Sequence, residues 1–116
     1  IEESPSAIED AKFNMSGIQN IEIIRGKAEV VLEEIDYMPE VVIVDPPRAG
    51  CQNEVLFSII KCRPEKVVYV SCDPSTLARD LDILIAGGFS IDFVDPIDMF
   101  PQTYHVECVV TLSYST

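Results

Sequence analysis

A cysteine stands where an apolar run gives way to a helix-start pattern. The run 66–71 ("KVVYVS") is followed directly by Cys72, and then by Asp73 and Pro74. Unpaired backbone N–H groups and the positive end of the helix dipole favour the thiolate, the nucleophilic form of cysteine, although the charge of Asp73 opposes this. Cys72 is therefore a candidate nucleophile. The alternative, a buried cysteine that only packs, stays open.

Three other polar residues flank apolar runs. Asp45 closes the run 41–45 ("VVIVD") before two prolines and Arg48, and could touch a ligand or only cap the proline turn. His105 and Glu107 lie at the start of the run 106–114, where a carboxylate could act as a base or simply be solvated. A lone histidine is usually satisfied by local contacts.

The elements that must position these residues alternate along the chain. Helix signals are predicted from Ser4-Pro5 to Gly17, over 27–35 and 53–62, and from Asp73-Pro74 to Gly87-Gly88. Strands are predicted over 21–25, 41–45, 66–71, 89–94 and 106–114. This alternation indicates an α/β fold with a largely parallel sheet, and the continuous apolar runs 41–45 and 66–71 predict strands covered on both faces. Ligands in such sheets bind beyond the carboxyl ends of the strands, where Asp45 and Cys72 stand.

The composition limits the classes of function. The chain has 116 residues, enough for one domain, and a net charge of −12, which is a poor surface for a nucleic-acid backbone. No apolar run reaches the roughly 20 residues that span a membrane, so no membrane partner is expected. The four cysteines form no CxxC pair and no nearby histidine set exists, so we expect no metal site and a reducing, cytoplasmic location.

Three stretches together resemble a known family. They are "DPPRAGC" (45–51), "VVYVSCDPSTLARDL" (67–81) and "DMFPQTYHVECVV" (98–110). The chain is similar in these to the S-adenosylmethionine-dependent RNA uracil-C5 methyltransferases, which make 5-methyluridine in tRNA and rRNA. The resemblance covers essentially the whole chain but only the C-terminal part of that family's catalytic domain. It implies a truncated Rossmann-like class I methyltransferase fold over 1–116, mostly parallel with the last strand antiparallel, lacking the first strand and the glycine-rich loop.

The resemblance also implies a covalent mechanism. Cys72 would add to C6 of uracil so that C5 can accept a methyl group, and Glu107 would then remove the C5 proton. The target uridine would be flipped out of its stack. The sulfur of Cys72 and the carboxylate of Glu107 should therefore converge on a cleft that admits one pyrimidine.

The remaining site residues are carried over in the same way. Glu2 would bind the ribose of S-adenosylmethionine, and Asp45 would lie between cofactor and base. Arg48 and His105 would support the site or the RNA. Lys27 departs from the pattern, because the family commonly has Asp or Asn there, near the adenine. Domains outside these residues would make most of the contacts to the RNA. The isolated chain is therefore expected to be inactive, and without the glycine-rich loop it should bind the cofactor weakly.

Three alternative functions remain from the residues themselves. Enzymes that methylate exocyclic amines usually place an aromatic residue after the prolines, and cytosine-C5 RNA methyltransferases a second cysteine; Arg48 stands there instead. A non-catalytic α/β interaction module is the third.

The strand predicted at 21–25 would lack its usual neighbour, so we expect it to dock beside 41–45 or to pair with another copy in a dimer.

Overall fold

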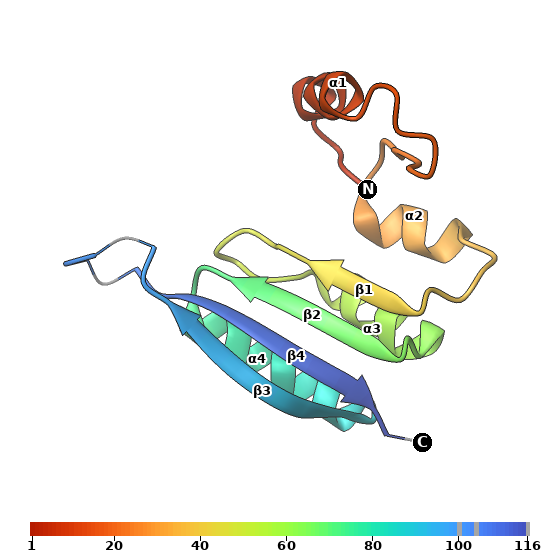
Figure 1. The fold of residues 1–116 in the computed structure, drawn as a ribbon. Helices are drawn as coiled ribbons and strands as arrows, with labels where there is room; N and C mark the ends of the chain where they lie inside the picture. Colours follow the sequence, from red (N-terminus) through yellow and green to blue (C-terminus); the bar gives the residue numbers. More distant parts are fainter. Residues whose placement is uncertain (100, 104, 116) are drawn as a thin grey trace. The chain divides into compact units, whose positions relative to one another are not determined.

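The computed structural model describes residues 1–99, 101–103 and 105–115, in two compact units, Ile1–Asp36 and Tyr37–Thr116. The first unit holds helices α1 (Pro5–Asn14) and α2 (Ala28–Glu34). The second holds two helices, α3 (Asn53–Cys62) and α4 (Pro74–Ala86). Its strands are β1 (Val41–Val44), β2 (Lys66–Ser71), β3 (Phe89–Ile97) and β4 (Glu107–Tyr114) (Figure 1).

The strands of the second unit form one sheet in the order β1-β2-β4-β3. β1 and β2 are parallel, and β4 runs antiparallel to both β2 and β3. The predicted α/β class, with an antiparallel last strand, is therefore confirmed. β3 continues to Ile97, past the predicted end at 94, because its pairing with β4 persists through a bulge between Ile91 and Phe93.

The core of this unit lies between the sheet and its helices. In Figure 1, α3 and α4 both lie behind the sheet, and the two helices contact each other. The side chains buried there come from alternate positions of the central strands and from the helices: Val67, Tyr69, Val110, Leu112, Leu56, Ile59, Leu77 and Leu84. Their burial follows from the period of two in strands and the helical spacing of the leucines.

β1 is less covered than its sequence predicts. Val42 and Val44 are half-buried, whereas Val41 is 50% and Ile43 69% exposed. The prediction that the run 41–45 is covered on both faces is wrong. The physical reason is that both helices of this unit lie on one face of the sheet, and β1 has only β2 as a hydrogen-bonded neighbour in it.

The first unit contains the clearest error in the predicted elements. Residues 21–25 form no strand; only Arg25 pairs, in an isolated parallel bridge with Glu2. The bridge is made by the Glu2 N–H to the Ile24 carbonyl (3.1 Å) and by the Gly26 N–H to the Glu2 carbonyl (3.0 Å). A strand needs a partner along its length, and here the partner is one residue long. Within the sheet of the second unit β1 pairs with β2 alone; docking of 21–25 beside 41–45, or in a dimer, stays a prediction.

The helix ends agree closely with the sequence. Ser4 caps α1, its hydroxyl accepting the Ala7 N–H (3.4 Å), and Pro5 opens the helix. α1 ends at Asn14, three residues before Gly17, which has φ +83°.

In the described ranges no helix combines the length and the apolar character needed to cross a membrane.

Candidate active site

Cys72 and Glu107 lie at the same end of the central strand pair. The last paired positions of β2 and β4 are Ser71 and Cys108. Cys72 follows Ser71, and Glu107 precedes Cys108, so each lies one residue beyond that pair. Both residues are half-buried, and Glu107 is also paired with Ile97 of β3. The antiparallel register thus brings residues 35 positions apart in the chain to the same sheet end.

The backbone around Cys72 is held on both sides. The Ser71 hydroxyl accepts the Asp73 N–H (3.1 Å) and donates to the Asp73 carbonyl (2.9 Å), which makes a tight turn around the cysteine. The Asp73 carboxylate then caps α4, accepting the N–H groups of Ser75 (2.9 Å) and Thr76 (3.2 Å). The Ser75 hydroxyl and these two amides hold the pKa of Asp73 below its usual value. The predicted position of Cys72, between a strand and a capped helix, is confirmed.

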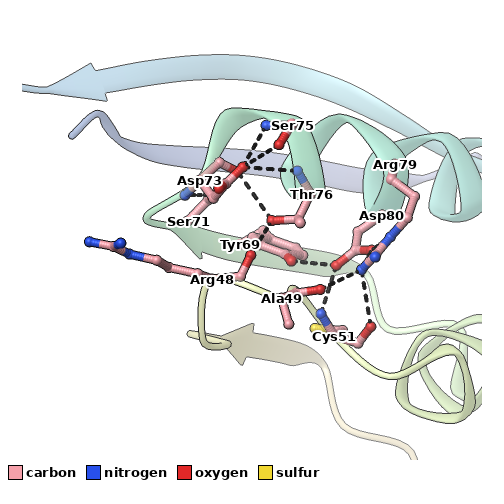
Figure 2. Close-up of polar contacts among 10 residues, drawn as sticks. All are labelled: Arg48, Ala49, Cys51, Tyr69, Ser71, Asp73, Ser75, Thr76, Arg79 and Asp80. Carbon is pink, nitrogen blue, oxygen red and sulfur yellow. Dashed lines mark hydrogen bonds and ion pairs between the residues drawn. The ribbon is translucent and has the colours of Figure 1, made fainter. Parts of the chain in front are cut away.

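The loop 45–51 lies beside the first two turns of α4. Asp45 and Arg48 are exposed, and the loop turns where the Gly50 N–H donates to the Pro47 carbonyl (2.8 Å). Figure 2 shows Thr76, Arg79 and Asp80 of α4 facing this loop. The Thr76 hydroxyl donates to the Arg48 carbonyl (2.8 Å). Helix α4 therefore carries contacts to the loop as well as the cap that follows Cys72.

Asp80 is a site residue that the sequence analysis missed. It is fully buried, and its Oδ2 accepts the Tyr69 hydroxyl (2.5 Å) and the Cys51 N–H (2.8 Å). Its Oδ1 accepts Nε (2.9 Å) and Nη2 (2.8 Å) of Arg79. These donors occupy the four acceptor sites of a carboxylate, which is what a buried charge requires. One signal was available: Asp80 lies three residues after Leu77, on the apolar stripe of its helix.

This buried cluster also changes the acidity of its neighbours. Burial, followed by the hydrogen bond to Asp80, raises the pKa of Tyr69. Burial is also the main cause that raises the pKa of Cys51 to about 11. Both groups therefore stay protonated at neutral pH. Cys51 is a packed thiol in this cluster, in contrast to Cys72 at the sheet end.

A second contact joins the loop to the segment before β4. Nη2 of Arg48 lies 3.2 Å from Nδ1 of His105. The two residues are 57 positions apart in the sequence. They come together because Arg48 follows β1 and His105 precedes β4, and both strands flank β2 in the sheet. The structure thus pairs the two residues that the resemblance assigns to a supporting role, and it connects the loop carrying Asp45 with the segment that leads to Glu107.

Glu2 lies in the first unit. Its backbone forms the bridge with Arg25, its side chain is exposed, and its Oε1 accepts the Ser4 N–H (2.9 Å). Lys27, the residue that departs from the family pattern, precedes α2 and is exposed. Within the part of the chain that the structure describes, no three His, Cys, Asp or Glu side chains are grouped to hold a metal ion.

Comparison with known proteins gives consistent matches. The family model described as tRNA (uracil-5-)-methyltransferase matches residues 1–115. An uncharacterised RNA methyltransferase of Oceanobacillus iheyensis is 52% identical over 97% of this chain and 26% of its own length. One of Clostridium acetobutylicum is 49% identical over 97% of this chain and 25% of its own length. The chain therefore spans about a quarter of the length of these curated relatives.

Solved structures agree with this result. The Pyrococcus abyssi tRNA (uracil-54, C5)-methyltransferase in complex with S-adenosyl-L-homocysteine superposes with a TM-score of 0.76 and 35% identity. The match covers 94% of this chain and 26% of that one. A Streptococcus thermophilus rRNA methylase, 15% identical with a TM-score of 0.75, covers 97% of this chain and 70% of its own. At that identity the likeness shows the fold alone, the Rossmann-like fold of class I methyltransferases.

Proposed function

Since the chain belongs to the tRNA (uracil-5-)-methyltransferase family, we propose that it is the C-terminal part of the catalytic domain of an enzyme that methylates C5 of uridine in tRNA or rRNA. The observation that carries this proposal is the register that brings Cys72 and Glu107 to the same end of β2 and β4. A nucleophile and a base at one sheet end are what the reaction needs. Neither exocyclic-amine methylation nor a non-catalytic module accounts for that pair.

The two residues have separate roles in this reaction. The Cys72 thiolate adds to C6 of the uracil ring, which makes C5 electron-rich. After C5 has been methylated, Glu107 removes the C5 proton, and the C6–S bond breaks as the ring double bond re-forms. The tight turn made by Ser71 and Asp73 holds the backbone on both sides of the sulfur during these steps. The uridine is flipped out of its stack to reach the thiol.

S-adenosylmethionine supplies the electrophilic methyl group in this family. Glu2 and Asp45 are the residues that would hold it, and both are exposed carboxylates, which accept hydrogen bonds from hydroxyl and ammonium groups. The contact from the Ser4 N–H occupies only Oε1 of Glu2, which leaves acceptor sites for a ribose hydroxyl. The complex of the Pyrococcus abyssi enzyme with S-adenosyl-L-homocysteine supports S-adenosylmethionine as the cofactor.

RNA binding is shared between this chain and the rest of the enzyme. The net charge of −12 opposes binding of a polyanion, so most phosphate contacts come from other domains of a cytoplasmic protein. Arg48 is an exposed cation on the loop that carries Asp45. Its exposed guanidinium, oriented by His105, contacts the RNA near the target uridine.

The test is a trapping experiment on the full-length protein. RNA that contains 5-fluorouridine is incubated with enzyme and S-adenosylmethionine, and the covalent complex is detected by its shift in a denaturing gel. Fluorine at C5 cannot be removed as a proton, so the adduct persists. Cys72→Ala should form none, whereas Cys62→Ala, a half-buried cysteine on α3, should still crosslink. A crosslink in the Cys72→Ala variant would refute the assignment.

A further inference from the structure

We propose that Thr76, Arg79 and Asp80 act as positioning residues for this reaction, because they hold the loop 45–51 in place relative to Cys72. We refer to these three residues as the α4 clamp. The inference rests on the proposed function, and it assigns roles to residues other than the proposed nucleophile, base and cofactor-binding residues.

The clamp contacts the backbone of the loop at three positions. The Thr76 hydroxyl donates to the Arg48 carbonyl (2.8 Å), and Nη2 of Arg79 donates to the Ala49 carbonyl (2.8 Å). The Cys51 N–H donates to the buried carboxylate of Asp80 (2.8 Å). Bonds to the main chain at nearly successive residues restrain the path of the loop itself. Asp45 and Arg48, the site residues on that loop, are positioned as a result.

The same helix also determines where Cys72 lies. The N-cap of α4 is Asp73, the residue after the cysteine. From this cap to Asp80 the helix rises by roughly 10 Å, a rigid span at 1.5 Å per residue. The loop and the nucleophile therefore share one rigid support, as Figure 2 shows for the cap and the clamp. A shift of the loop along α4 changes the distance between Asp45 and the sulfur.

Gly50 shows how closely the loop approaches the clamp. Its φ is +79°, and a Cβ built on it would lie 2.5 Å from Nη2 of Arg79 and 2.6 Å from Oδ2 of Asp80. Only a residue without a side chain allows this contact. Asp80 cannot retreat, because Tyr69 holds the same oxygen from the strand side. A single methyl group at position 50 should therefore push the loop off the clamp.

Two substitutions test the clamp without touching the reacting groups. Thr76→Val keeps the shape of the side chain but removes its bond to the Arg48 carbonyl. Gly50→Ala adds the methyl group that collides with Arg79 and Asp80. Gly17→Ala is the matched control for the second, because Gly17 has a similar φ of +83° but nothing within 4 Å of its added Cβ. It carries the same backbone strain without the collision.

Two quantities are measured on the full-length protein. The first is hydrogen–deuterium exchange of peptides covering 45–51, which should speed up by about tenfold in both clamp variants, because the loop opens locally. The second is steady-state methylation of the RNA. We expect kcat to fall by about 10- to 100-fold, because small misplacements of reacting groups are this costly, while KM for RNA stays nearly unchanged. Gly17→Ala should match the unsubstituted protein in both.

The outcomes separate the clamp from the proposed function. Unchanged exchange in both variants would overturn the clamp, and so would faster exchange with an unchanged kcat. A fall in activity that follows only the loss of folded protein, measured by thermal melting, would also overturn it, because it indicates a structural role. If the unsubstituted protein does not methylate uridine at all, the proposed function fails, whatever the exchange shows.

Discussion

Cys72 and Glu107 each lie one residue beyond the Ser71–Cys108 pair that ends the ladder between β2 and β4. This relationship depends on the reversed direction of β4. If β4 were parallel to β2, its first residue would lie at the opposite end of the sheet, a strand length away from Cys72. The antiparallel last strand is therefore what brings the first residue of β4 to the same sheet end as the residue that follows β2.

The role of Glu107 predicts a stalled intermediate. With Glu107→Gln, the Cys72 adduct should still form and be methylated, but loss of the C5 proton should slow by about 10²- to 10⁴-fold, the range for a general base. Ordinary uridine RNA should then remain attached to the protein, with the methyl group incorporated. Mass spectrometry of the complex, with labelled methyl donor, measures this. Glu65→Gln, at an exposed position before β2, is the control, and full turnover by the Glu107 variant would disprove the assignment.

Tyr69→Phe should destabilise the protein measurably. Its hydroxyl donates to a fully buried carboxylate, and hydrogen bonds to charged groups contribute about 1.5–3 kcal/mol each. We expect the free energy of unfolding, from urea titration, to fall by about that amount. Tyr37→Phe removes a hydroxyl from a side chain that is 57% exposed and should change stability by less than about 0.5 kcal/mol. An equal effect of the two substitutions would show that the Asp80 cluster contributes little.

The cluster around Asp80 also predicts a loss of stability in alkali. The pKa of Cys51 is raised to about 11 in the folded state, so the unfolded chain loses this proton first as the pH rises. Fewer protons are then bound in the unfolded state, and stability must fall between about pH 9 and 11. The raised pKa of Tyr69 acts in the same direction at higher pH.

Urea titrations at pH 8 to 11 measure this effect. Cys51→Ala should flatten the decline between about pH 9 and 11, whereas Cys62→Ala should leave it unchanged. The same slope in all three proteins would mean that Cys51 does not titrate as the structure indicates.

The cap of α4 should make stability depend on pH in the opposite direction, so that stability falls as the pH is lowered. The pKa of Asp73 is lowered in the folded state by the Ser75 hydroxyl and by the amides of Thr76 and Ser75. Its stabilisation is therefore complete above the usual aspartate value, and it is lost as the pH falls through the lowered pKa. Asp73→Asn keeps a capping oxygen without a titratable group, so its stability should depend less on pH below about 4. Thermal melts from pH 2 to 6, with Asp82→Asn as a control on the exposed side of α4, test this.

Local sequence determined those elements whose causes are local. The limits of α3, β2 and α4 agree with the predicted ones, because apolar periodicity, the Asp73 cap and the glycines after α4 act within a few residues. At 21–25 the apolar residues wrongly predicted a strand, because this stretch forms only a single bridge, between Arg25 and Glu2. A strand is stable only when a partner lies beside it, and no short stretch of sequence states whether one does.

For the candidate site, too, some features follow from the sequence and others only from the tertiary structure. Residue types and motif order in the sequence were enough to single out Cys72, Asp45 and Glu107 and the family to which the chain belongs. Only the tertiary structure decided that Cys72 and Glu107 lie at the same end of the ladder between β2 and β4, and that Asp80 joins the loop 45–51 to α4. The reason is physical: strand register and the partners of a buried charge are set by residues distant in the chain, which are brought together only when the sheet and its helices pack.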